Sequence, residues 1–504
     1  MNKETFWYSG TADDSVSVYK DKPDGSPTED VRHTCLCENA HFIFSLSLVL
    51  GAVYALCFFH SEYMGINVFV FSVSLCAVST ISLRRLGLSN KKRNIFWSLC
   101  IGLLGFSVAW TANESVQLIS FLGIILSEMF WVMSASDNVL LWRLGRVIAG
   151  CFRLMGRTAT HLPEPFRHMA KPHKTDGCTR NVLLGLCIAV PLCLVILSLL
   201  SDADAAFASL IRHIIGGSVP SAIKNAFQCI ITVFVVAVVF YSSLAAQTDH
   251  GECSVREKKR ASSVIAVTFT LALAVIYAVF CGIQVVVLFA GNASALPANM
   301  TYAEYAREGF FQLLIVSGIN VLLIIYAQSC FASSKMLRSL LLFLSVCTYI
   351  MEASSAMRMI LYVNVYGLTF LRIFVLWFLV LLAVLLGAAL YTVFHPDFHL
   401  FRFAFISCMV FWLLFAFARS ERIAAKYNFE HYSPNDAAAW QFINDCSLDA
   451  VPALRPYFDF VTEDNAEGYF KLGIPDDYKC RGVRGFNISA WEAMQTAEDY
   501  TYGK

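Results

Sequence analysis

Two aspartates, Asp202 and Asp204, form the pattern in this sequence that comes nearest to a catalytic motif. Paired carboxylates are ligands for hard divalent cations, and in sugar transfer such a pair can hold a metal beside a nucleotide or lipid-linked phosphate. The same residues precede an apolar repeat that begins at Phe207, and carboxylates at a helix start interact favourably with the helix dipole. A phosphate-side catalytic pair and a structural helix start are therefore both open, and we favour the structural role.

Charged and aromatic residues gather in two other short segments, one from Glu304 to Glu308 and one from Arg358 to Arg372, each beside an apolar run. In the second segment Arg358 and Tyr362 are spaced as i and i+4, so the guanidinium could rest on the phenol ring or pair with an acid. The segments supply either a ligand site or a set of structural ion pairs. Together with the two aspartates, the candidate residues of this site are Asp202, Asp204, Glu304, Arg307, Glu308, Arg358, Tyr362, Tyr366 and Arg372.

Three further polar side chains lie inside the apolar runs. Glu128 and Glu352 are carboxyl groups at membrane depth, where charge is costly, so each is a candidate functional group facing a bundle interior or a wet cavity. Both lie nearer to an end than to the centre of their predicted spans. The structural alternative is a protonated carboxyl bonded to a hydroxyl, such as Ser355 for Glu352. Asn320, like Gln284, is typical of hydrogen bonds between membrane helices.

Motifs of the common nucleotide and cofactor sites are absent from the sequence. It contains no Walker loop, no dinucleotide-binding glycine turn, no kinase signature, no H-E-x-x-H and no G-x-S-x-G. His395 and His399 flank a proline, which breaks the helix that a two-histidine metal site needs. We therefore predict no metal and no cofactor. In the C-terminal tail, Cys446 and Cys480 could form a disulfide on an oxidising side of the membrane.

The elements that hold these residues are apolar runs of about 20 residues, each long enough to cross about 30 Å of hydrocarbon. A composition of 57% hydrophobic and 15% charged residues, with a mean hydropathy of +0.59, excludes a water-soluble globular protein. The net charge of +1 gives no sign of a nucleic-acid partner. We predict an all-α, polytopic transmembrane helix bundle of about eleven spans. The spans are 42–59, 64–83, 95–110, 115–134, 182–200, 226–245, 264–290, 310–330, 339–356, 371–394 and 399–418.

Positive charge sets the orientation of these spans, because Lys and Arg are retained on the cytoplasmic side during insertion. Most of the 38 Lys and Arg residues fall on one side when the N-terminus is cytoplasmic. An odd number of spans in a cell membrane then places the C-terminus outside. The predicted parts are a disordered acidic cytoplasmic arm at 1–41, four membrane helices at 42–134, a basic cytoplasmic loop at 135–181, a membrane core at 182–418 and a small helical extracytoplasmic tail at 419–504.

The basic loop contains an amphipathic helix. Arginines at 143, 146, 153 and 157 alternate with apolar side chains at Leu141, Leu144, Ile148, Phe152 and Met155. Such a helix is typical of a segment that lies on the lipid bilayer, here on its anionic inner leaflet through residues 141–157. The alternative is a docking site for a cytosolic partner.

Five sequence stretches resemble the recurring motifs of one bacterial membrane family. They are SDADAAFASL at 201–210, YAEYAREGFFQLLIVSGIN at 302–320, AMRMILYVNVYGLTFLR at 356–372, AAKYN at 424–428 and SLDAVPAL at 447–454. Together they look like the multi-pass family catalogued as domain of unknown function 4173, which is related to the 4153 group. The resemblance covers roughly residues 180–455. It implies a helical membrane protein and supplies neither an activity nor catalytic residues.

The predicted orientation places all of these motifs on the outer side of the membrane, so a shared site there is our main hypothesis. The best interpretation is an integral membrane protein of unknown biochemical activity that serves as an extracytoplasmic-facing recognition, sensing or assembly module, binding an envelope ligand or a partner protein. One alternative is a transporter of a small or lipid-like solute. Another is a membrane-embedded transferase that acts on a lipid-linked substrate.

Overall fold

The computed structural model describes the chain in segments, and these segments are almost entirely helical. The described residues are 29–59, 61–169, 207, 209, 221–248, 261–290, 310–431, 446–456 and 482–502. Within them the regular elements are helices, with one isolated β-bridge between Ala261 and Phe331. Ten helices of these segments are long and apolar enough to cross a membrane. The predicted all-α polytopic bundle is therefore confirmed, and the chain is a multi-pass membrane protein.

The ten helices coincide with ten of the eleven predicted spans. The remaining predicted span, 182–200, lies outside the described residues, as do residues 1–28 of the arm that was predicted to be disordered over 1–41. Residues 29–41 of that arm are helical and form the start of α1. The ten are α1 (Glu29–Phe58), α2 (Ile66–Arg85), α3 (Lys91–Trp110), α4 (Glu114–Ser136), α9 (Ser221–Thr248), α10 (Ser263–Ala290), α12 (Phe310–Cys330), α13 (Lys335–Tyr366), α14 (Phe370–Phe394) and α15 (Leu400–Ala418).

Polar caps and glycine mark where several of these helices begin and end. Asn113 accepts a hydrogen bond from the backbone N–H of Val116 at 3.0 Å, at the start of α4. Ser334 accepts one from Leu337 N–H at 3.2 Å, at the start of α13. Each cap satisfies a donor that the first helical turn leaves without an internal partner. At the end of α13, Gly367 has a φ of 75°, a conformation that costs glycine little because it lacks a Cβ.

The first bundle consists of α1 to α4 and α9, whose side chains share one hydrophobic core. Glycine permits the closest helix contacts in this bundle. A Cβ added to Gly51 of α1 would lie 2.2 Å from the carbonyl oxygen of Val233 in α9. One added to Gly105 of α3 would lie 2.4 Å from Ser72 Oγ in α2. Small residues let backbones approach in a membrane, where contact with a neighbouring helix replaces contact with equally apolar lipid.

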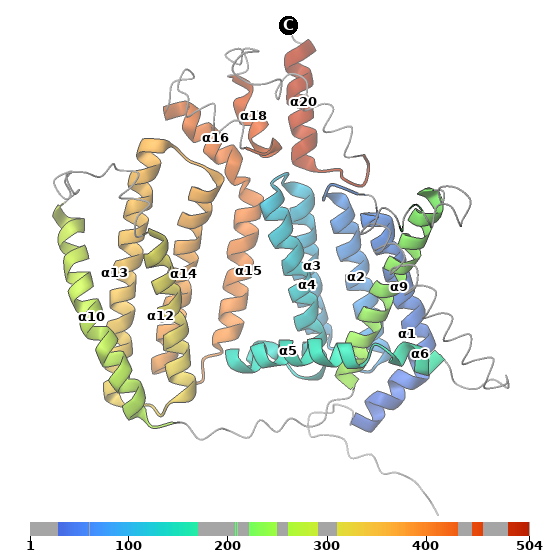
Figure 1. Ribbon diagram of the computed structural model, residues 1–504, viewed down its shortest axis with the longest axis horizontal. Helices are drawn as coiled ribbons and strands as arrows, with labels where there is room; N and C mark the ends of the chain where they lie inside the picture. Colours follow the sequence, from blue (N-terminus) through green and yellow to red (C-terminus); the bar gives the residue numbers. More distant parts are fainter. Residues whose placement is uncertain are drawn as a thin grey trace, which may run out of the picture.

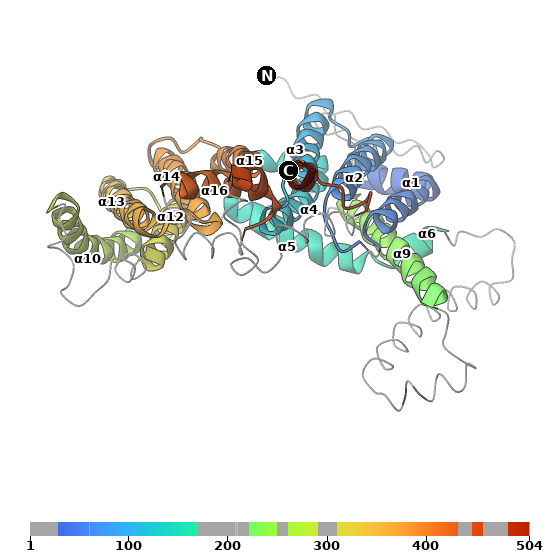
Figure 2. The ribbon, with the colours of Figure 1, turned by 90° about the horizontal axis from the view of Figure 1, so that it is seen from above.

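The second bundle consists of α10, α12, α13 and α14, and its core is separate from that of the first. The helix α15 stands between the two bundles (Figure 1). Its Trp412 donates a hydrogen bond from Nε1 to Ser120 Oγ of α4 at 3.0 Å and packs against Trp377 of α14, with ring centroids 5.9 Å apart. Aromatic side chains on α15 therefore join the two bundles, which from above form one elongated row (Figure 2).

The two ends of the row carry different structures (Figure 1). At one end, called here the cap end, the turns at 61–65, 111–113 and 367–369 lie beneath a layer of short C-terminal helices. This layer, the cap, consists of residues 419–431, 446–456 and 482–502. Its helices are α16 (Ser420–His431), η3 (Leu448–Ala450), α18 (Val451–Leu454) and α20 (Ile488–Tyr502). The opposite end carries α5 (Leu144–Thr160) and α6 (Glu164–Met169), and is called the α5 end.

The described part of the predicted tail, 419–504, is helical as expected. Residues 448–454 form η3 and then α18, with Pro452 in the first turn of α18. Proline suits this position because its missing N–H would have no intrahelical partner there. Cys480, the proposed partner of Cys446, lies outside the described residues, so the predicted disulfide stays a prediction.

The predicted basic amphipathic helix is present as α5, and it lies across the spans at the α5 end (Figure 1). Val147 and Leu154 are buried in contact with the first bundle. Ile148, Phe152 and Met155 of the predicted apolar face are 50, 72 and 61% exposed. Of the positions that the alternation of Arg and apolar residues singled out, Leu144 also packs against this core, but Ile148, Phe152 and Met155 do not anchor α5 to the protein.

Replacing Gly51 by Ala should destabilise the protein by about 1–3 kcal/mol, because the new Cβ meets a backbone carbonyl that cannot move without displacing α9. Gly102→Ala is the matched control on α3, since its Cβ would have no atom within 4 Å. It should be neutral or stabilising, because alanine favours helix more than glycine does. Thermal unfolding in detergent measures both variants. A Gly51→Ala midpoint at or above that of Gly102→Ala would contradict the close α1–α9 contact.

Candidate functional site

The predicted outer site is only partly visible in the structure. Asp202, Asp204, Glu304, Arg307 and Glu308 lie outside the described residues. Of the other four predicted residues, three come together around the turn from α13 to α14, whereas Arg358 lies about two helical turns before the end of α13. The three are Tyr362, Tyr366 and Arg372.

Arg372 organises that turn. Its guanidinium carbon lies 4.3 Å from the ring centroid of Tyr362, and its Nη1 donates to the carbonyl oxygens of Tyr366, at 2.7 Å, and Gly367. These carbonyls end α13 and have no partner within the helix. The cation that covers Tyr362 here is thus Arg372, whereas the i, i+4 spacing predicted Arg358. The contacts of Arg372 give it a structural role at the end of α13.

The cap holds the same turn from above through Asn428 of α16. The Leu368 N–H donates to Asn428 Oδ1 at 2.6 Å, and Asn428 Nδ2 donates to the Leu368 carbonyl at 2.7 Å. One side-chain amide thus satisfies both backbone groups of a single residue, as a neighbouring strand would. Asn428 belongs to the family-like stretch AAKYN, so this stretch has a docking role.

A buried carboxylate in the cap binds the turn between α3 and α4. Asp449 is 1% exposed, and its Oδ1 accepts a hydrogen bond from Ala112 N–H at 2.7 Å while Oδ2 accepts one from Thr111 Oγ1. Hydrogen bonds to a charged acceptor are about twice as strong as neutral ones. Asp449 lies in the stretch SLDAVPAL. Through Asp449, this stretch is therefore bound to the first bundle.

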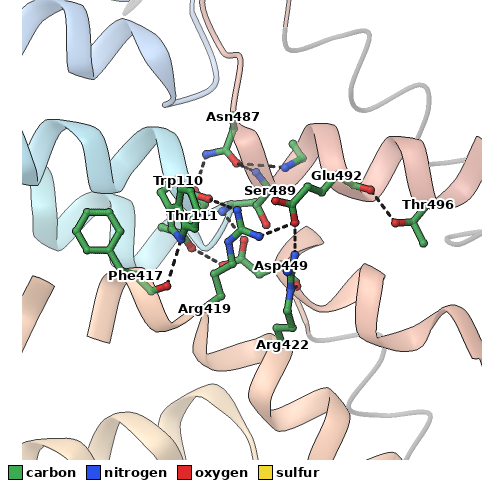
Figure 3. Close-up of polar contacts among 12 residues, drawn as sticks. Trp110, Thr111, Phe417, Arg419, Arg422, Asp449, Asn487, Ser489, Glu492 and Thr496 are labelled. Carbon is green, nitrogen blue, oxygen red and sulfur yellow. Dashed lines mark hydrogen bonds and ion pairs between the residues drawn. The ribbon is translucent and has the colours of Figure 1, made fainter. Parts of the chain in front are cut away.

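Two arginines and a glutamate form an ion-pair cluster beside Asp449 (Figure 3). Arg419 Nη1 lies 2.6 Å from Glu492 Oε2, and Arg422 Nη2 pairs with the same oxygen. Arg419 also lies over the Trp110 ring, 4.3 Å from its centroid. Burial alone would raise the pKa of Glu492, but hydrogen bonds and positive charge from the two arginines outweigh it and lower that pKa below its ordinary value.

Glu421 is a second buried carboxylate of the cap, 4% exposed. Its Oε1 accepts from Asn113 Nδ2 at 2.8 Å, and its Oε2 accepts from Ser447 N–H at 2.9 Å and from the Ser447 hydroxyl. Burial, reinforced by the charge of Asp449, raises the pKa of Glu421, although the hydrogen bonds from Ser447 and Asn113 oppose this effect. Glu421 thus links α16, the start of α4 and the start of η3.

Two side-chain amides satisfy the carbonyl end of α3. Asn487 Nδ2 donates to the carbonyls of Val108 at 3.0 Å and Thr111 at 2.6 Å, and its Oδ1 accepts from Ser489 N–H at the start of α20. Gln117 Nε2 donates to the same two carbonyls, at 3.2 and 2.7 Å. The cap therefore completes the backbone hydrogen bonding of a membrane helix at the point where it ends.

The cap also reaches the turn between α1 and α2. Arg484 Nη1 donates to the Phe59 carbonyl at 3.0 Å, and Ile66 N–H donates to the Phe486 carbonyl at 2.8 Å. The cap thus binds three interhelical turns, two in the first bundle and one in the second. We call these contacts the cap network: Asn428 to Leu368, Asp449 to Thr111 and Ala112, Glu421 to Asn113, Asn487 to Val108 and Thr111, Arg419 and Arg422 to Glu492, and Arg484 to Phe59.

The family described as domain of unknown function DUF4153 matches residues 98–457, which is more than half of the chain. The chain belongs to the DUF4153 family. The narrower 4173 assignment suggested by the motifs is not confirmed. No curated protein and no solved structure matches the chain.

The DUF4153 match covers one side of the cap network and omits the other. It includes Thr111, Glu421 and Asp449, but it ends before Asn487 and Glu492. The cap residues 446–456 therefore belong to the family region, whereas α20 lies beyond it. Among the described residues, no group of three or more His, Cys, Asp and Glu side chains is placed to hold a metal ion.

The intramembrane candidates differ in how well their polar atoms are partnered. Asn320 of α12 accepts from the Tyr277 hydroxyl at 3.0 Å and donates to Thr348 Oγ1 at 2.9 Å. Its predicted role between helices is confirmed. Glu128 accepts a hydrogen bond from the Ser79 hydroxyl at 2.6 Å, which gives it the hydroxyl partner that the structural alternative requires.

Glu352 differs from both of those residues. It is 5% exposed, and neither of its carboxyl oxygens has a hydrogen-bond partner among the described residues. The expected bond to Ser355 is not formed, since the Ser355 hydroxyl also has no partner there. Glu352 lies close to the middle of α13, because this helix runs from Lys335 to Tyr366 and so extends beyond both ends of the predicted span 339–356.

Sequence reasoning missed the carboxylates of the cap network, and a signal for one of them was present. Asp449 stands between apolar residues in a stretch that was recognised only as a motif. An acid in such surroundings indicates a buried, partnered carboxylate. Nothing comparable marks Glu421 and Glu492, which lie in helices of ordinary mixed composition.

Glu492→Gln should reduce stability near neutral pH by about 1–3 kcal/mol, because it removes a charged acceptor shared by two arginines. The folded-state pKa of Glu492 is depressed from 4.5, so its stabilising contribution is complete above that value and is lost as pH falls through the folded-state pKa. The difference between wild type and variant should therefore shrink in acid. Unfolding midpoints from neutral pH downward test this, and a difference that is constant with pH would contradict it.

Glu430→Gln serves as the control for this pH series. Glu430 is exposed on α16 and lies 4.0 Å from Lys426, with a side chain 55% exposed. Exposed pairs of this kind contribute little, about 0–1 kcal/mol. The variant should follow the wild-type midpoint at every pH.

Proposed function

We propose that this DUF4153 protein is a recognition, sensing or assembly module whose cap binds an envelope ligand or a partner protein on the outer side of the cell membrane. The observation that carries the proposal is the cap network, in which a folded layer joins three interhelical turns through buried polar contacts. The helices supply a membrane anchor and a rigid base. The cap supplies the surface that faces water.

The distribution of positive charge supports this orientation. In the described part of the chain, the α5 end carries Arg84 and Arg85 at the end of α2, three basic residues at the start of α3, and the arginines of α5. Lys335 and Arg338 add to that end at the start of α13. Basic loops are retained in the cytoplasm, so the α5 end is cytoplasmic in this proposal and the cap is extracytoplasmic.

The cap contacts both helix bundles, and this favours a recognition role over transport by movement of one bundle against the other. Alternating access moves one group of helices against another around a central site. Here the cap binds Phe59 and Thr111 in the first bundle and Leu368 in the second. Movement of the bundles at this end would break buried hydrogen bonds, each of which is costly to leave unmade. A rigid membrane base for the cap therefore fits these contacts better than two bundles that move against each other.

The cap also presents exposed apolar side chains that a partner could cover. Val483 is 88% exposed, Ile423 49% and Trp491 38%. Aromatic and apolar residues surrounded by polar groups are enriched at the centres of protein interfaces. These positions are the natural places from which to test binding.

Site-specific photo-crosslinking in intact cells tests the recognition role. A photoreactive residue at Val483 or Ile423 should give discrete crosslinked products, whereas one at Thr160 in α5, on the proposed cytoplasmic side, should not give the same products. Asp449→Asn, which weakens the docking of the cap by about 1–3 kcal/mol, should reduce those products at equal protein abundance. The absence of products from both cap positions, or identical products from Thr160, would overturn the proposal.

The proposed contact of α5 with the anionic inner leaflet follows from three faces of that helix. Val147 and Leu154 face the first bundle. At about 100° per residue, Ile148, Phe152 and Met155 share a second face, and the arginines at 146, 153 and 157 share a third on the opposite side of the helix from it. An interfacial helix buries its apolar face in the acyl region and keeps its basic face among headgroups.

A photoreactive residue placed at Phe152 or at the adjacent Arg153 tests this contact. In vesicles of phosphatidylcholine and phosphatidylglycerol, position 152 should give several-fold more lipid adducts by mass spectrometry than position 153, because the two residues lie on different faces. Equal yields from the two positions would reject the interfacial placement. Adducts to protein in place of lipid would favour the cytosolic-partner alternative.

Solute transport is the second candidate, and a specific observation favours it. The second bundle contains buried polar side chains on α12 and α13, including Asn320, Thr348 and Glu352. Such residues inside a membrane bundle often mark an ion or proton pathway. The transferase alternative depends on Asp202 and Asp204, which lie outside the described residues.

A further inference from the structure

Buried polar side chains follow the contact between α12 and α13 deep in the membrane. On α13, Ser345, Thr348, Glu352 and Ser355 are spaced by three, four and three residues, so they share one helix face, and all are buried. On α12, Ser317 and Asn320 are also buried. We call these six residues the polar seam. At 1.5 Å per residue, the α13 part extends over about 15 Å along the helix.

The seam has a partnered half and an unpartnered half. Asn320 bonds to Thr348, which also donates to the Leu344 carbonyl, and Ser345 donates to the Leu341 carbonyl at 2.8 Å. Because α12 and α13 are antiparallel, Ser317, Glu352 and Ser355 all lie on the cap side of the Asn320–Thr348 pair. These three side chains have no hydrogen-bond partner among the described residues.

In the described parts of α10, α12, α13 and α14, no cation is positioned to balance a charge on Glu352. The described residues of α10 and α12 include no Lys, Arg or His, and the one basic residue of α14, Arg372, is bonded in the α13–α14 turn. The basic residues of α13 lie near its ends, the closest in sequence being Arg358, six residues from Glu352. An ionised Glu352 would therefore be an uncompensated charge in a low-dielectric interior, which is strongly unfavourable.

The other titratable groups near the seam are neutral hydrogen-bond donors. On α10, the Tyr277 hydroxyl donates to Asn320 and Cys281 Sγ donates to the Cys347 carbonyl. On α13, the Tyr349 hydroxyl donates to the Ala383 carbonyl of α14 at 3.0 Å. None of these groups bears a positive charge that would hold Glu352 ionised.

We propose that Glu352 is an intramembrane proton-binding site, neutral at rest, whose proton exchanges with water through the cap side of the polar seam. The bound ligand is the proton itself, and release leaves a carboxylate that the free hydroxyl hydrogens of Ser317 and Ser355 can approach. This site stands independently of the recognition role. It would supply the coupling group if the second candidate, transport, is correct.

Infrared spectroscopy of the protein in lipid vesicles tests the site directly. A protonated carboxyl has a characteristic C=O stretching band, and the Glu352 band is the one that disappears in Glu352→Gln. In wild type this band should be present at neutral pH, should shift on transfer to deuterium oxide and should decline as pH is raised. Glu128→Gln is the matched control, because Glu128 lies in the first bundle and is bonded to Ser79, and its removal should leave the Glu352 band unchanged.

The direction of exchange is tested by variants of the seam. Ser355→Ala and Ser317→Ala should slow the deuterium shift of the Glu352 band several-fold without removing the band. Ser345→Ala, on the other side of the Asn320–Thr348 pair, should leave the rate unchanged. A band that does not shift in deuterium oxide would identify a sequestered structural carboxyl and overturn the proposal, as would the absence of any band assigned by Glu352→Gln. Equal slowing by Ser345→Ala would overturn the cap-side route.

Cap crosslinking and the infrared band report on separate parts of the molecule. Loss of the crosslinks with an intact, exchangeable band would reject the recognition role and leave the proton site standing. The reverse pattern would reject the proton site alone.

Discussion

Every helix that ends at a membrane surface leaves backbone groups that need partners, and this constraint explains the architecture of the cap end. The carbonyl of Phe59 beyond α1 is bonded by Arg484, those of Val108 and Thr111 around the end of α3 by Asn487, and that of Leu368 beyond α13 by Asn428. All three donors come from the C-terminal part of the chain. The cap is therefore part of the membrane fold, because it completes the hydrogen bonding of helices in both bundles.

Among the described residues, the carboxyl groups of the cap network and that of Glu352 differ in whether their oxygens have hydrogen-bond partners. In the cap network, Asp449 and Glu421 use both oxygens, and Glu492 is shared by two arginines. Removing a buried charge from water is compensated there by several short, charge-assisted contacts. In the second bundle, Glu352 has no such contacts among the described residues. The first group holds the structure together, whereas the second leaves a polar group available for chemistry.

Some parts of the fold and site were predictable, and the errors have physical causes. Asn320 was expected to bond between helices, because an amide in hydrocarbon has few other partners. The end of α13 was misplaced because Arg358 and Asn364 lower the hydropathy, although the backbone continues as helix to Tyr366 beyond the apolar run. Hydropathy measures the apolar thickness that a helix crosses, and it does not measure the length of the helix. For the same reason, the prediction did not place Glu352 near the middle of the helix α13.

The sequence by itself determined that this is an all-α membrane protein, where ten of its spans lie, and that a basic amphipathic helix follows α4. These features depend on the composition of some twenty neighbouring residues, so they can be read locally. Only the tertiary structure decided which polar groups meet. Thr111 and Asp449 are separated by 338 positions, and their contact depends on how helices pack and where the cap docks. That packing also decides which carboxyl groups have hydrogen-bond partners and which do not.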